Sequence, residues 1–201
     1  NPFHSGHLYQ MEQVRAQTGA DYIVIAMSGD FVQRGEPAVY DKYTRAAMAL
    51  NCGADLVLEL PVRFATGSAE DFAACGVNLL DSLGIVDMLC FGSELGELSP
   101  LETAAEALCR EPEAYRNVLK ELLKQGYSYP AARSSALCSY LEHSTMAGSA
   151  ASGKKAAEVQ PDYQSILSSS NNILAVEYLK ALKRQDSHME PFTIRRAGQD
   201  Y

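Results

Sequence analysis

Two histidines separated by a serine and a glycine, His4, Ser5, Gly6 and His7, stand directly before an amphipathic segment. A helix that begins at this point offers unpaired backbone N–H groups and the positive end of its dipole, and both attract phosphate. Gly6 lets phosphates lie against the backbone. The imidazoles can donate hydrogen bonds to an α-phosphate as charge develops on it during transfer. This H-x-G-H pattern therefore predicts His4 and His7 as catalytic residues of a nucleotidyl transfer.

By itself the pattern also fits surface histidines or a metal-binding pair. The following residues favour the catalytic interpretation, because an apolar stripe at Leu8, Met11 and Val14 predicts a helix that ends at Gly19. A β-branched run at 22–27 then predicts a strand. A nucleotide-binding turn of this kind normally leaves a buried parallel strand, so we expect an upstream strand of about five or six residues ahead of the first residue.

Composition limits the class of protein. The 201 residues suit one large domain, and 47% hydrophobic residues are enough for a packed core. No apolar run approaches the ~18–20 residues that span a bilayer, and no signal peptide pattern is present, so we expect a cytoplasmic protein without a membrane segment. The five cysteines are odd in number and lack C-x-x-C spacing. They are therefore expected to be buried thiols rather than disulfides or zinc ligands.

Charge is unevenly distributed along the chain. The net charge is −8, with 10 Lys and Arg against 19 Asp and Glu in residues 1–149, and 7 against 6 in residues 150–201. A broad nucleic-acid interface normally has a basic face. If RNA is a partner, most of the contact is expected in a small basic patch or in sequence outside this chain.

Polar residues follow the first predicted strand, where ligands bind in open α/β sheets. Arg34 lies in the loop 28–37, and it is predicted either to hold a phosphate or carboxylate or to be solvated. Residues 41–52 predict a helix with Asp41 as its N-cap. On that helix Lys42 and Arg45 share a face, which is either solvated or directed at a triphosphate. These three cations are the candidates for contacts with a second substrate.

The middle of the chain predicts two further strands and a capped helix. Residues 56–60 form the second strand, and Ser68 with Asp71 fits a capping box for a helix through Leu83. Glu70 and Asp71 are magnesium candidates, although acidic residues are common in a first helical turn. Residues 85–91 form the third strand and lead into Gly92 at the same sheet edge.

A helical block separates this strand from the last one. Ser99, with Pro100 and Glu102, predicts a helix start, and helices at about 101–109, 113–124 and 131–142 make up an insertion over about 99–145. Residues 144–162 are rich in small residues, and we expect a mobile loop beside the site.

The last part of the chain returns to a helix and a strand. The helix covers 170–184, with Asn171 either as its N-cap or in contact with adenine or ribose. The final strand, 192–196, ends in Arg195 and Arg196. Because neighbouring residues on a strand face opposite sides, one of the two is expected to reach a phosphate, and we favour Arg196.

Strands that alternate with helices at a spacing of roughly 30 residues predict an α/β fold with a doubly wound parallel sheet, Rossmann-like in architecture. The sequence shows no internal repeats. We therefore expect a single domain over 1–201 with the helical insertion described above.

The chain contains, in this order, the blocks NPFHSGHLY, MSGDFVQRGEPAVYDKYTRA, GADLVLELP, SAEDFA, CFGSE, SNNILAVEYLKALKR and TIRR. With these blocks the sequence resembles the H-x-G-H nucleotidyltransferase superfamily and, more closely, the bacterial tRNA(Met) cytidine acetate ligases. The resemblance covers nearly the whole chain.

The resemblance implies that ATP and acetate form acetyl-adenylate, and that the acetyl group passes to N4 of the wobble cytidine of elongator tRNA(Met). Mg²⁺ would neutralise the phosphates. His4 and His7 would steady the α-phosphate. The remaining ATP-binding residues implied in this way are Asn1, Pro2, Phe3, Ser5, Gly6, Gly92, Asn171, Arg195 and Arg196.

Two positions depart from the family pattern. Ser170 stands where a proline is expected, and Asp30, usually asparagine or another residue, receives no role. The family continues past position 201 into a region implicated in tRNA binding, so the chain is expected to hold the adenylation module without the whole RNA-binding surface.

Two other functions stay open at this point. One is a coenzyme-type adenylyltransferase, which needs a second phosphate pocket that only Arg34, Lys42 and Arg45 are available to build. The other is a non-catalytic module that binds nucleotide or RNA and tolerates loss of the histidines.

Overall fold

The computed structural model describes residues 2–152 and 161–196, with Arg34 and residues 145–152 described by backbone alone. The strands are β1 (Val24–Ser28), β2 (Leu56–Leu60), β3 (Met88–Ser93) and β4 (Glu190–Arg195). The longer helices are α1 (Ser5–Thr18), α2 (Lys42–Asn51), α4 (Ala69–Asp81), α5 (Leu98–Arg110), α6 (Glu113–Lys124), α7 (Tyr129–Ser152) and α9 (Ser170–Arg184). Short helices are α3 (Val62–Ala65), α8 (Tyr163–Ile166) and a 3₁₀ turn at Gln33–Gly35.

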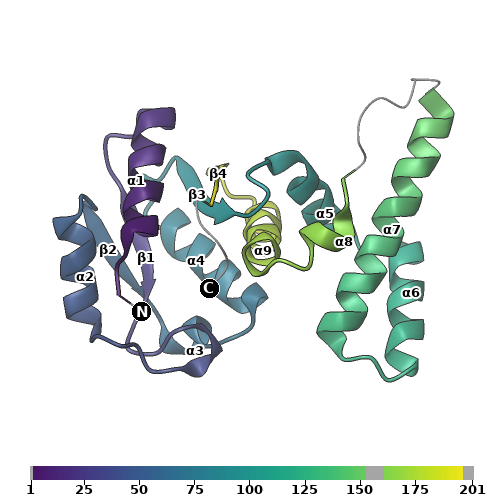
Figure 1. Ribbon diagram of the computed structural model, residues 1–201, viewed down its shortest axis with the longest axis horizontal. Coiled ribbons are helices and arrows are strands. Elements are labelled where there is room, and N and C mark those ends of the chain that lie inside the picture. The colour runs from purple at the N-terminus through teal and green to yellow at the C-terminus, as the bar shows by residue number, and fades with distance from the viewer. Residues whose placement is uncertain (1, 153–160, 197–201) are drawn as a thin grey trace.

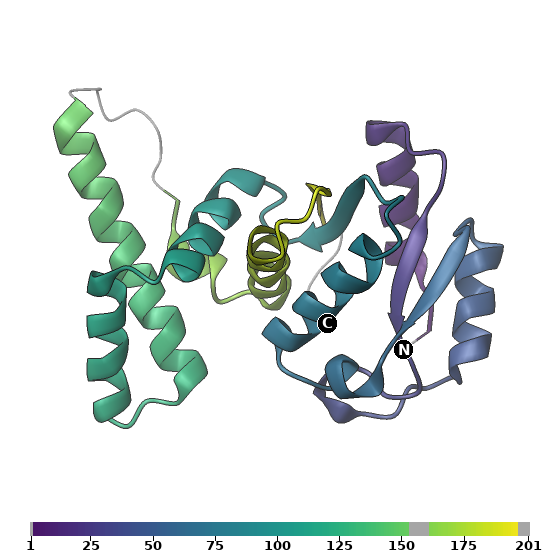
Figure 2. The same ribbon diagram turned by 180° about the vertical axis from the view of Figure 1, so that it is seen from behind.

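The strands form two parallel pairs (Figures 1 and 2). β1 pairs with β2 from Val24–Leu56 to Ser28–Leu60, and β3 pairs with β4 from Met88–Glu190 to Ser93–Arg195. Within the described residues the two pairs are not hydrogen-bonded to each other. The prediction of an α/β fold with parallel strands is confirmed.

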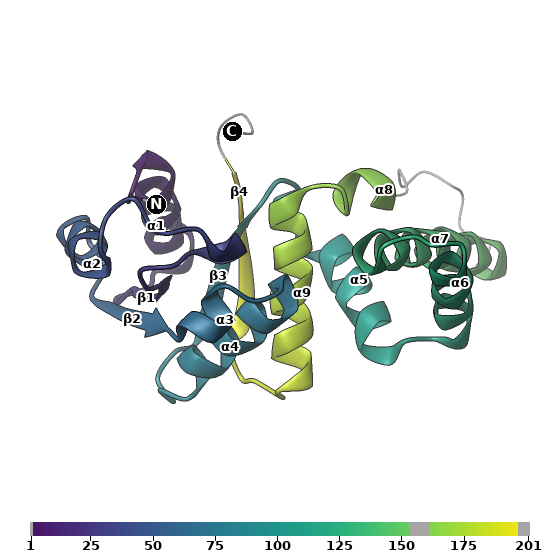
Figure 3. The ribbon, with the colours of Figure 1, turned by 90° about the horizontal axis from the view of Figure 1, so that it is seen from below.

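Helices cover both faces of the strands, as a doubly wound fold requires. Ile23 and Ile25 pack with α1 and α2, whereas Val24 and Ala26 pack into the main core with α4 and α9. This alternation follows from the period of two along a strand. Figure 3 shows α1 and α2 on one side of the strands and α4 and α9 on the other.

The strand ends differ from the predicted ones. The first strand begins at Val24 rather than Tyr22, the third runs over 88–93 rather than 85–91, and the last begins at Glu190. Pairing with the partner strand sets these ends, and a local apolar run does not reveal the register of that pairing. The second strand, 56–60, is as predicted.

Between β3 and α9 the described chain contains only helices, as predicted (Figure 1). α5 packs against α9, and α6 and α7 form a helical hairpin. The predicted loop at 144–162 is wrong over its first part, because α7 continues to Ser152. Alanine-rich sequence supports helix even where no apolar period marks it. Residues 153–160 lie outside the described part of the chain.

Helix ends were predicted well where a side chain caps them. Gly19 ends α1 in the left-handed region, Asp41 accepts the Thr44 N–H at the start of α2, and Ser68 accepts the Asp71 N–H at the start of α4. The helix expected to be capped by Ser99 instead starts at Leu98. Its N-cap is Glu97, whose side chain makes no capping bond.

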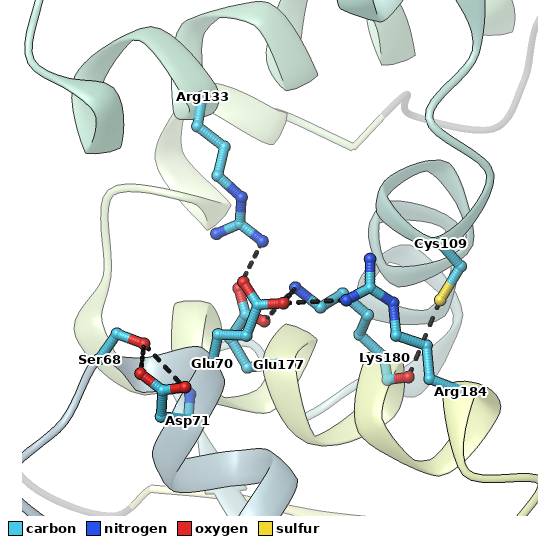
Figure 4. Close-up of polar contacts among 8 residues, drawn as sticks. All are labelled: Ser68, Glu70, Asp71, Cys109, Arg133, Glu177, Lys180 and Arg184. Carbon is cyan, nitrogen blue, oxygen red and sulfur yellow. Dashed lines mark hydrogen bonds and ion pairs between the residues drawn. The ribbon is translucent and has the colours of Figure 1, made fainter. Parts of the chain in front are cut away.

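A chain of ion pairs joins α4, α7 and α9 (Figure 4). Glu177 contacts Arg133 at 2.5 Å and Lys180 at 2.7 Å, and Glu70 contacts Lys180 at 3.0 Å and Arg184 at 2.9 Å. The side chains of Glu177 and Lys180 are 1% and 5% exposed. The network therefore fixes the helical block to the α/β part of the fold.

All five cysteines are free, but the prediction that they are buried is wrong for most of them. Cys138 is buried and Cys52 is exposed, while Cys75, Cys90 and Cys109 are half-buried. In the described part of the chain, none of the helices has the length and hydrophobicity that a membrane span requires.

Candidate nucleotide site

The H-x-G-H segment starts α1, and its own side chains cap the helix. The Gly6 N–H donates to His4 Nδ1 at 3.1 Å, and the His4 N–H donates to His7 Nδ1 at 3.3 Å. The two imidazoles stack with ring centroids 3.8 Å apart. Both residues keep part of their surface accessible to solvent. The pattern therefore brings the two predicted catalytic histidines together.

The capping bonds also define which ring nitrogen carries the proton. A neutral imidazole that accepts at Nδ1 carries its hydrogen on Nε2. Desolvation by the surrounding protein, the neighbouring His4 and the charge of Arg196 together lower the pKa of His7 from 6.5 to about 4. His7 is therefore neutral at physiological pH and presents an Nε2–H donor away from the helix.

The other residues of the segment support this start of α1. Pro2 and Phe3 are half-buried, and the Phe3 ring lies 5.3 Å from the His7 ring. Ser5 is exposed at the first helical position. A Cβ at Gly6 would lie 3.0 Å from Cε1 and 3.1 Å from Nδ1 of His4, so glycine is needed there for the ring to stack. The predicted ligand Asn1 lies outside the described residues.

Arg196 directly follows β4 and acts electrostatically on His7. Its backbone N–H donates to the Ser93 carbonyl at 3.0 Å, and a Cβ at Gly92 would lie 3.3 Å from Arg196 Cγ. The Arg196 charge reaches His7, whose pKa it lowers. Gly92 thus leaves room for the arginine stem, and the preference for Arg196 is consistent with its placement near His7.

Arg195 takes a different direction. Its Cβ would be 2.6 Å from a Cβ added at Gly96, so this residue packs against the turn that follows β3. Arg195, the last residue of β4, and Arg196, which follows it, therefore have different surroundings.

Asn171 lies in the first turn of α9, but it is not the N-cap. That position is Ser169, which makes no side-chain capping bond. The carboxylate of Glu94 replaces the cap, because Oε2 accepts the Asn172 N–H at 2.9 Å and Oε1 accepts Asn171 Nδ2 at 2.7 Å. A cap supplied by a distant loop has no local sequence signature, so the prediction of Asn171 as N-cap was wrong.

The cations proposed for a second substrate are otherwise engaged. Lys42 Nζ contacts Glu59 at 2.8 Å, and the Lys42 backbone N–H donates to Asp30. Arg45 is 4% exposed and donates to the carbonyls of Tyr40, Ser28 and Gly29.

The interpretation of Arg45 as part of a solvated face was wrong, because its side chain is buried and donates to the backbone carbonyls of the turn after β1. An exposed basic face and a buried arginine bound to backbone carbonyls have the same sequence spacing. The side chain of Arg34 lies outside the described residues.

Glu94 and Asn172 are the polar residues that sequence reasoning missed. Asn172 is 3% exposed, accepts the N–H groups of Glu94 and Leu95 at Oδ1, and donates to the Ile166 carbonyl. Burial raises the pKa of Glu94, but hydrogen bonds from Asn171 and Asn172 outweigh this effect and hold the pKa below its ordinary value. The sequence signal was the pair of polar residues Ser93 and Glu94 where a buried strand ends.

The described residues do not form a metal site made of protein side chains alone. Within the described chain no group of three or more His, Cys, Asp or Glu side chains is placed to hold a metal ion. The former magnesium candidates have other partners, since Glu70 pairs with Lys180 and Arg184 and Asp71 bonds to Ser68.

Parallel strands covered on both faces, with H-x-G-H at the start of α1, define an α/β nucleotidyltransferase. A family model described as HIGH Nucleotidyl Transferase matches residues 1–201. The chain therefore belongs to the HIGH nucleotidyl transferase family, as the resemblance indicated.

Particular relatives narrow the comparison. The chain is 50% identical to the tRNA(Met) cytidine acetate ligase of Acetivibrio thermocellus, over 100% of this chain and 45% of that protein. It is 48% identical to the protein of that name from Thermoanaerobacter sp. strain X514, over 100% of this chain and 46% of the relative. The chain thus spans about half the length of the curated relatives it matches.

A solved structure agrees with both comparisons. Thermotoga maritima TmcAL bound with alpha-thio ATP is 41% identical and has a TM-score of 0.86, over 98% of this chain and 44% of that one. The apo form of the same protein gives a TM-score of 0.87. The fold prediction is thus confirmed by an experimental structure of the same architecture.

Proposed function

We propose that this protein is an ATP-dependent ligase that activates acetate as acetyl-adenylate and transfers the acetyl group to N4 of the wobble cytidine of elongator tRNA(Met). The observation that carries the proposal is the pair of stacked, backbone-capped imidazoles at the start of α1. The names of the relatives supply the carboxylate and the acceptor. The structure of a relative bound with alpha-thio ATP supports the nucleotide.

In the first step an acetate oxygen attacks the α-phosphorus of ATP. The new O–P bond forms as the bond to the bridging oxygen breaks, and pyrophosphate leaves. His4 and His7 direct their Nε2–H donors at the α-phosphate, where negative charge grows during attack. Arg196 adds a positive charge that acts on His7.

In the second step the cytidine N4 amine attacks the acyl carbon of acetyl-adenylate. The C–O bond to the phosphate breaks, AMP leaves, and the amine loses one proton. The acetate oxygen that attacked phosphorus therefore remains in AMP. The resemblance assigns ATP binding to residues 1–7 and to Gly92, Asn171, Arg195 and Arg196.

The proposal includes Mg²⁺ bound to the phosphates of the nucleotide. The described residues offer no cage of three acidic side chains. Mg²⁺ commonly keeps several waters and binds through substrate phosphates, an arrangement that needs no such cage.

The coenzyme-type adenylyltransferase is less well supported. It needs a second phosphate pocket, and two of the three cations available for one are engaged with Glu59 and with backbone carbonyls. A non-catalytic module and a ligase would both bind ATP, so only a measurement of turnover distinguishes them.

ATP–pyrophosphate exchange tests the proposal. We expect exchange that requires acetate and that falls about 100-fold or more in His7→Ala, the loss typical of removing one stabilising donor. The control is His143→Ala on α7, whose Nδ1 meets the Ser139 carbonyl of its own helix. ATP binding without any acetate-dependent exchange would favour the non-catalytic module.

A further inference from the structure

The turn after β3 and the start of α9 are interlocked by a reciprocal set of hydrogen bonds. Glu94 accepts from Asn171 Nδ2 and from the Asn172 N–H, while Asn172 Oδ1 accepts from the N–H groups of Glu94 and Leu95. Asn172 is buried, and Glu94 and Asn171 are half-buried. The geometry of Asn171 is therefore imposed by Glu94 from outside its own helix.

A carboxylate can only accept hydrogen bonds, so the Asn171 group that faces Glu94 must be the NH₂. This excludes a flipped amide while Glu94 is ionised. Hydrogen bonds to the carboxylate hold the pKa of Glu94 below its ordinary value, so it stays ionised at neutral pH. Asn171 Oδ1, which has no hydrogen-bond partner among the described residues, is left as a free acceptor.

Glu94 also lies next to the candidate phosphate site. Its Oε1 is 4.0 Å from Arg196 Nη1, and Arg196 in turn acts on His7. Gln10 of α1 donates to Cys90 of β3 at 3.8 Å, which places the helix that carries the histidines beside this strand. Glu94 and Asn171 therefore border the same sheet edge as the H-x-G-H segment.

We propose that Glu94 is a positioning residue that fixes Asn171 as a hydrogen-bond acceptor and so makes the site select nucleotides by a donor group of the nucleoside. Two groups of ATP have this chemistry, the adenine amino group and the ribose hydroxyls. The inference rests on the proposed function, because it assumes that a nucleotide occupies this edge.

The proposal predicts what inverting the amide does. Oε1 of Glu94 also accepts the Asn171 N–H, at 3.4 Å, whereas Oε2 accepts the Asn172 N–H at 2.9 Å. In Glu94→Gln the Gln carbonyl keeps the shorter bond to a backbone N–H, so the Gln NH₂ faces Asn171, whose side-chain amide turns over and presents its own NH₂ outward. A donor then meets a donor, and the selectivity is lost. In the double variant Glu94→Gln with Asn171→Asp, the Gln NH₂ donates to one Asp oxygen and the other oxygen faces outward as an acceptor. The double variant therefore restores the polarity of the wild type.

The experiment measures dissociation constants by calorimetry for ATP, ITP, 2′-deoxyATP and 3′-deoxyATP. ITP lacks the amino donor, and each deoxy analogue lacks one hydroxyl. We expect the wild type to bind ATP about tenfold or more tightly than at least one analogue, equivalent to about one net hydrogen bond. Glu94→Gln should reduce that preference to about threefold or less, and the double variant should recover it.

Glu97→Gln is the matched control. Glu97 lies three residues after Glu94, is exposed and makes no capping bond. The substitution removes the same charge, so the preference for ATP over the analogues should not change. A purely structural role would weaken ATP and analogues alike in Glu94→Gln, and that result overturns the inference. Equal wild-type affinity for all four nucleotides also overturns it and leaves the ligase proposal standing. A wild type that binds no nucleotide contradicts the proposed function itself.

Discussion

The two imidazoles at the start of α1 depend on the absence of a side chain at Gly6. A methyl group there would lie 3.0 Å from His4 Cε1, closer than ordinary carbon contacts allow. The stack can persist only if the His4 ring moves.

We therefore expect Gly6→Ala to reduce ATP–pyrophosphate exchange about tenfold or more while the free energy of unfolding changes by less than about 1 kcal/mol, because alanine itself favours helix. Chemical denaturation and exchange assays measure the two quantities. Ala16→Gly, at an exposed position of the same helix, is the control. Ala16→Gly should lower the free energy of unfolding and leave ATP–pyrophosphate exchange intact. Normal exchange in Gly6→Ala, or an equal loss of exchange in Ala16→Gly, would contradict the role of Gly6.

The lowered pKa of His7 predicts a dependence of stability on pH. With a folded-state pKa of about 4 against 6.5 in the unfolded chain, the unfolded chain binds more protons between these values. The stabilisation that comes from a neutral His7 is therefore complete above pH 6.5 and is lost as the pH falls through 4. The wild type should lose more stability than His7→Gln between pH 7 and 4.

NMR titration of the His7 ring gives the direct readout, with a midpoint near 4. A midpoint near 6.5 would show that His7 is not held neutral by its surroundings.

At the residue scale, the sequence was sufficient wherever the chemistry is local. His4, Gly6 and His7 act within one turn of helix, so their spacing already defines their geometry. The role of Glu94 depends on residues 77 and 78 positions away, and the burial of Arg45 depends on carbonyls at the end of β1. No spacing rule within a short window contains such contacts.

At the scale of elements, the ion pairs around Glu177 join three helices (Figure 4). Removing its carboxylate in Glu177→Ala leaves Lys180 with Glu70 as its remaining partner and leaves Arg133 without its contact on α9. We expect a loss of about 3–5 kcal/mol in the free energy of unfolding, as for other buried charges that lose a partner.

Lys124→Ala is the matched control, because its pair with Glu121 has side chains 71% and 63% exposed. Exposed pairs contribute about 0–1 kcal/mol, so this variant should remain close to the wild type. Equal effects from the two substitutions in urea denaturation would show that the Glu177 network is not a structural link.

The order and type of the main elements could be predicted from hydrophobic period and helix caps, whereas their ends often could not. Asp41 and Ser68 cap helices through neighbouring N–H groups, and both were found. α7 extends past its last apolar turn to Ser152, and α9 receives its cap from another loop. The signals failed where tertiary contacts or alanine-rich composition decided the end of an element.

For the whole molecule, the net charge of −8 opposes a strong grip on RNA. We expect residues 1–201 alone to bind tRNA with a dissociation constant above about 10 μM at physiological salt, within or beyond the range of non-specific binding. Filter binding at several salt concentrations measures this. Tight binding with a steep salt dependence would show that the basic residues of this chain form a substantial RNA site.

The upstream strand stays a prediction. We expect it between β1 and β3. The β1–β2 and β3–β4 pairs are not hydrogen-bonded to each other within the described residues, and helices pack on both faces of the strands. Amide hydrogen exchange of a longer form of the protein checks this. The amides of β1 and β3 should exchange more slowly in the longer form than in residues 1–201. Equal exchange rates in the two forms would contradict the presence of the upstream strand.

The fate of an acetate oxygen tests the central claim, attack of a carboxylate on the ATP α-phosphate, most directly. With ¹⁸O-labelled acetate, ATP and an amine acceptor such as hydroxylamine or tRNA, mass spectrometry of the nucleotide products follows the label. We predict AMP that carries one ¹⁸O atom, because the attacking oxygen stays on phosphorus when the acyl carbon is transferred. Unlabelled AMP, or ADP as the product, would contradict attack at the α-phosphate.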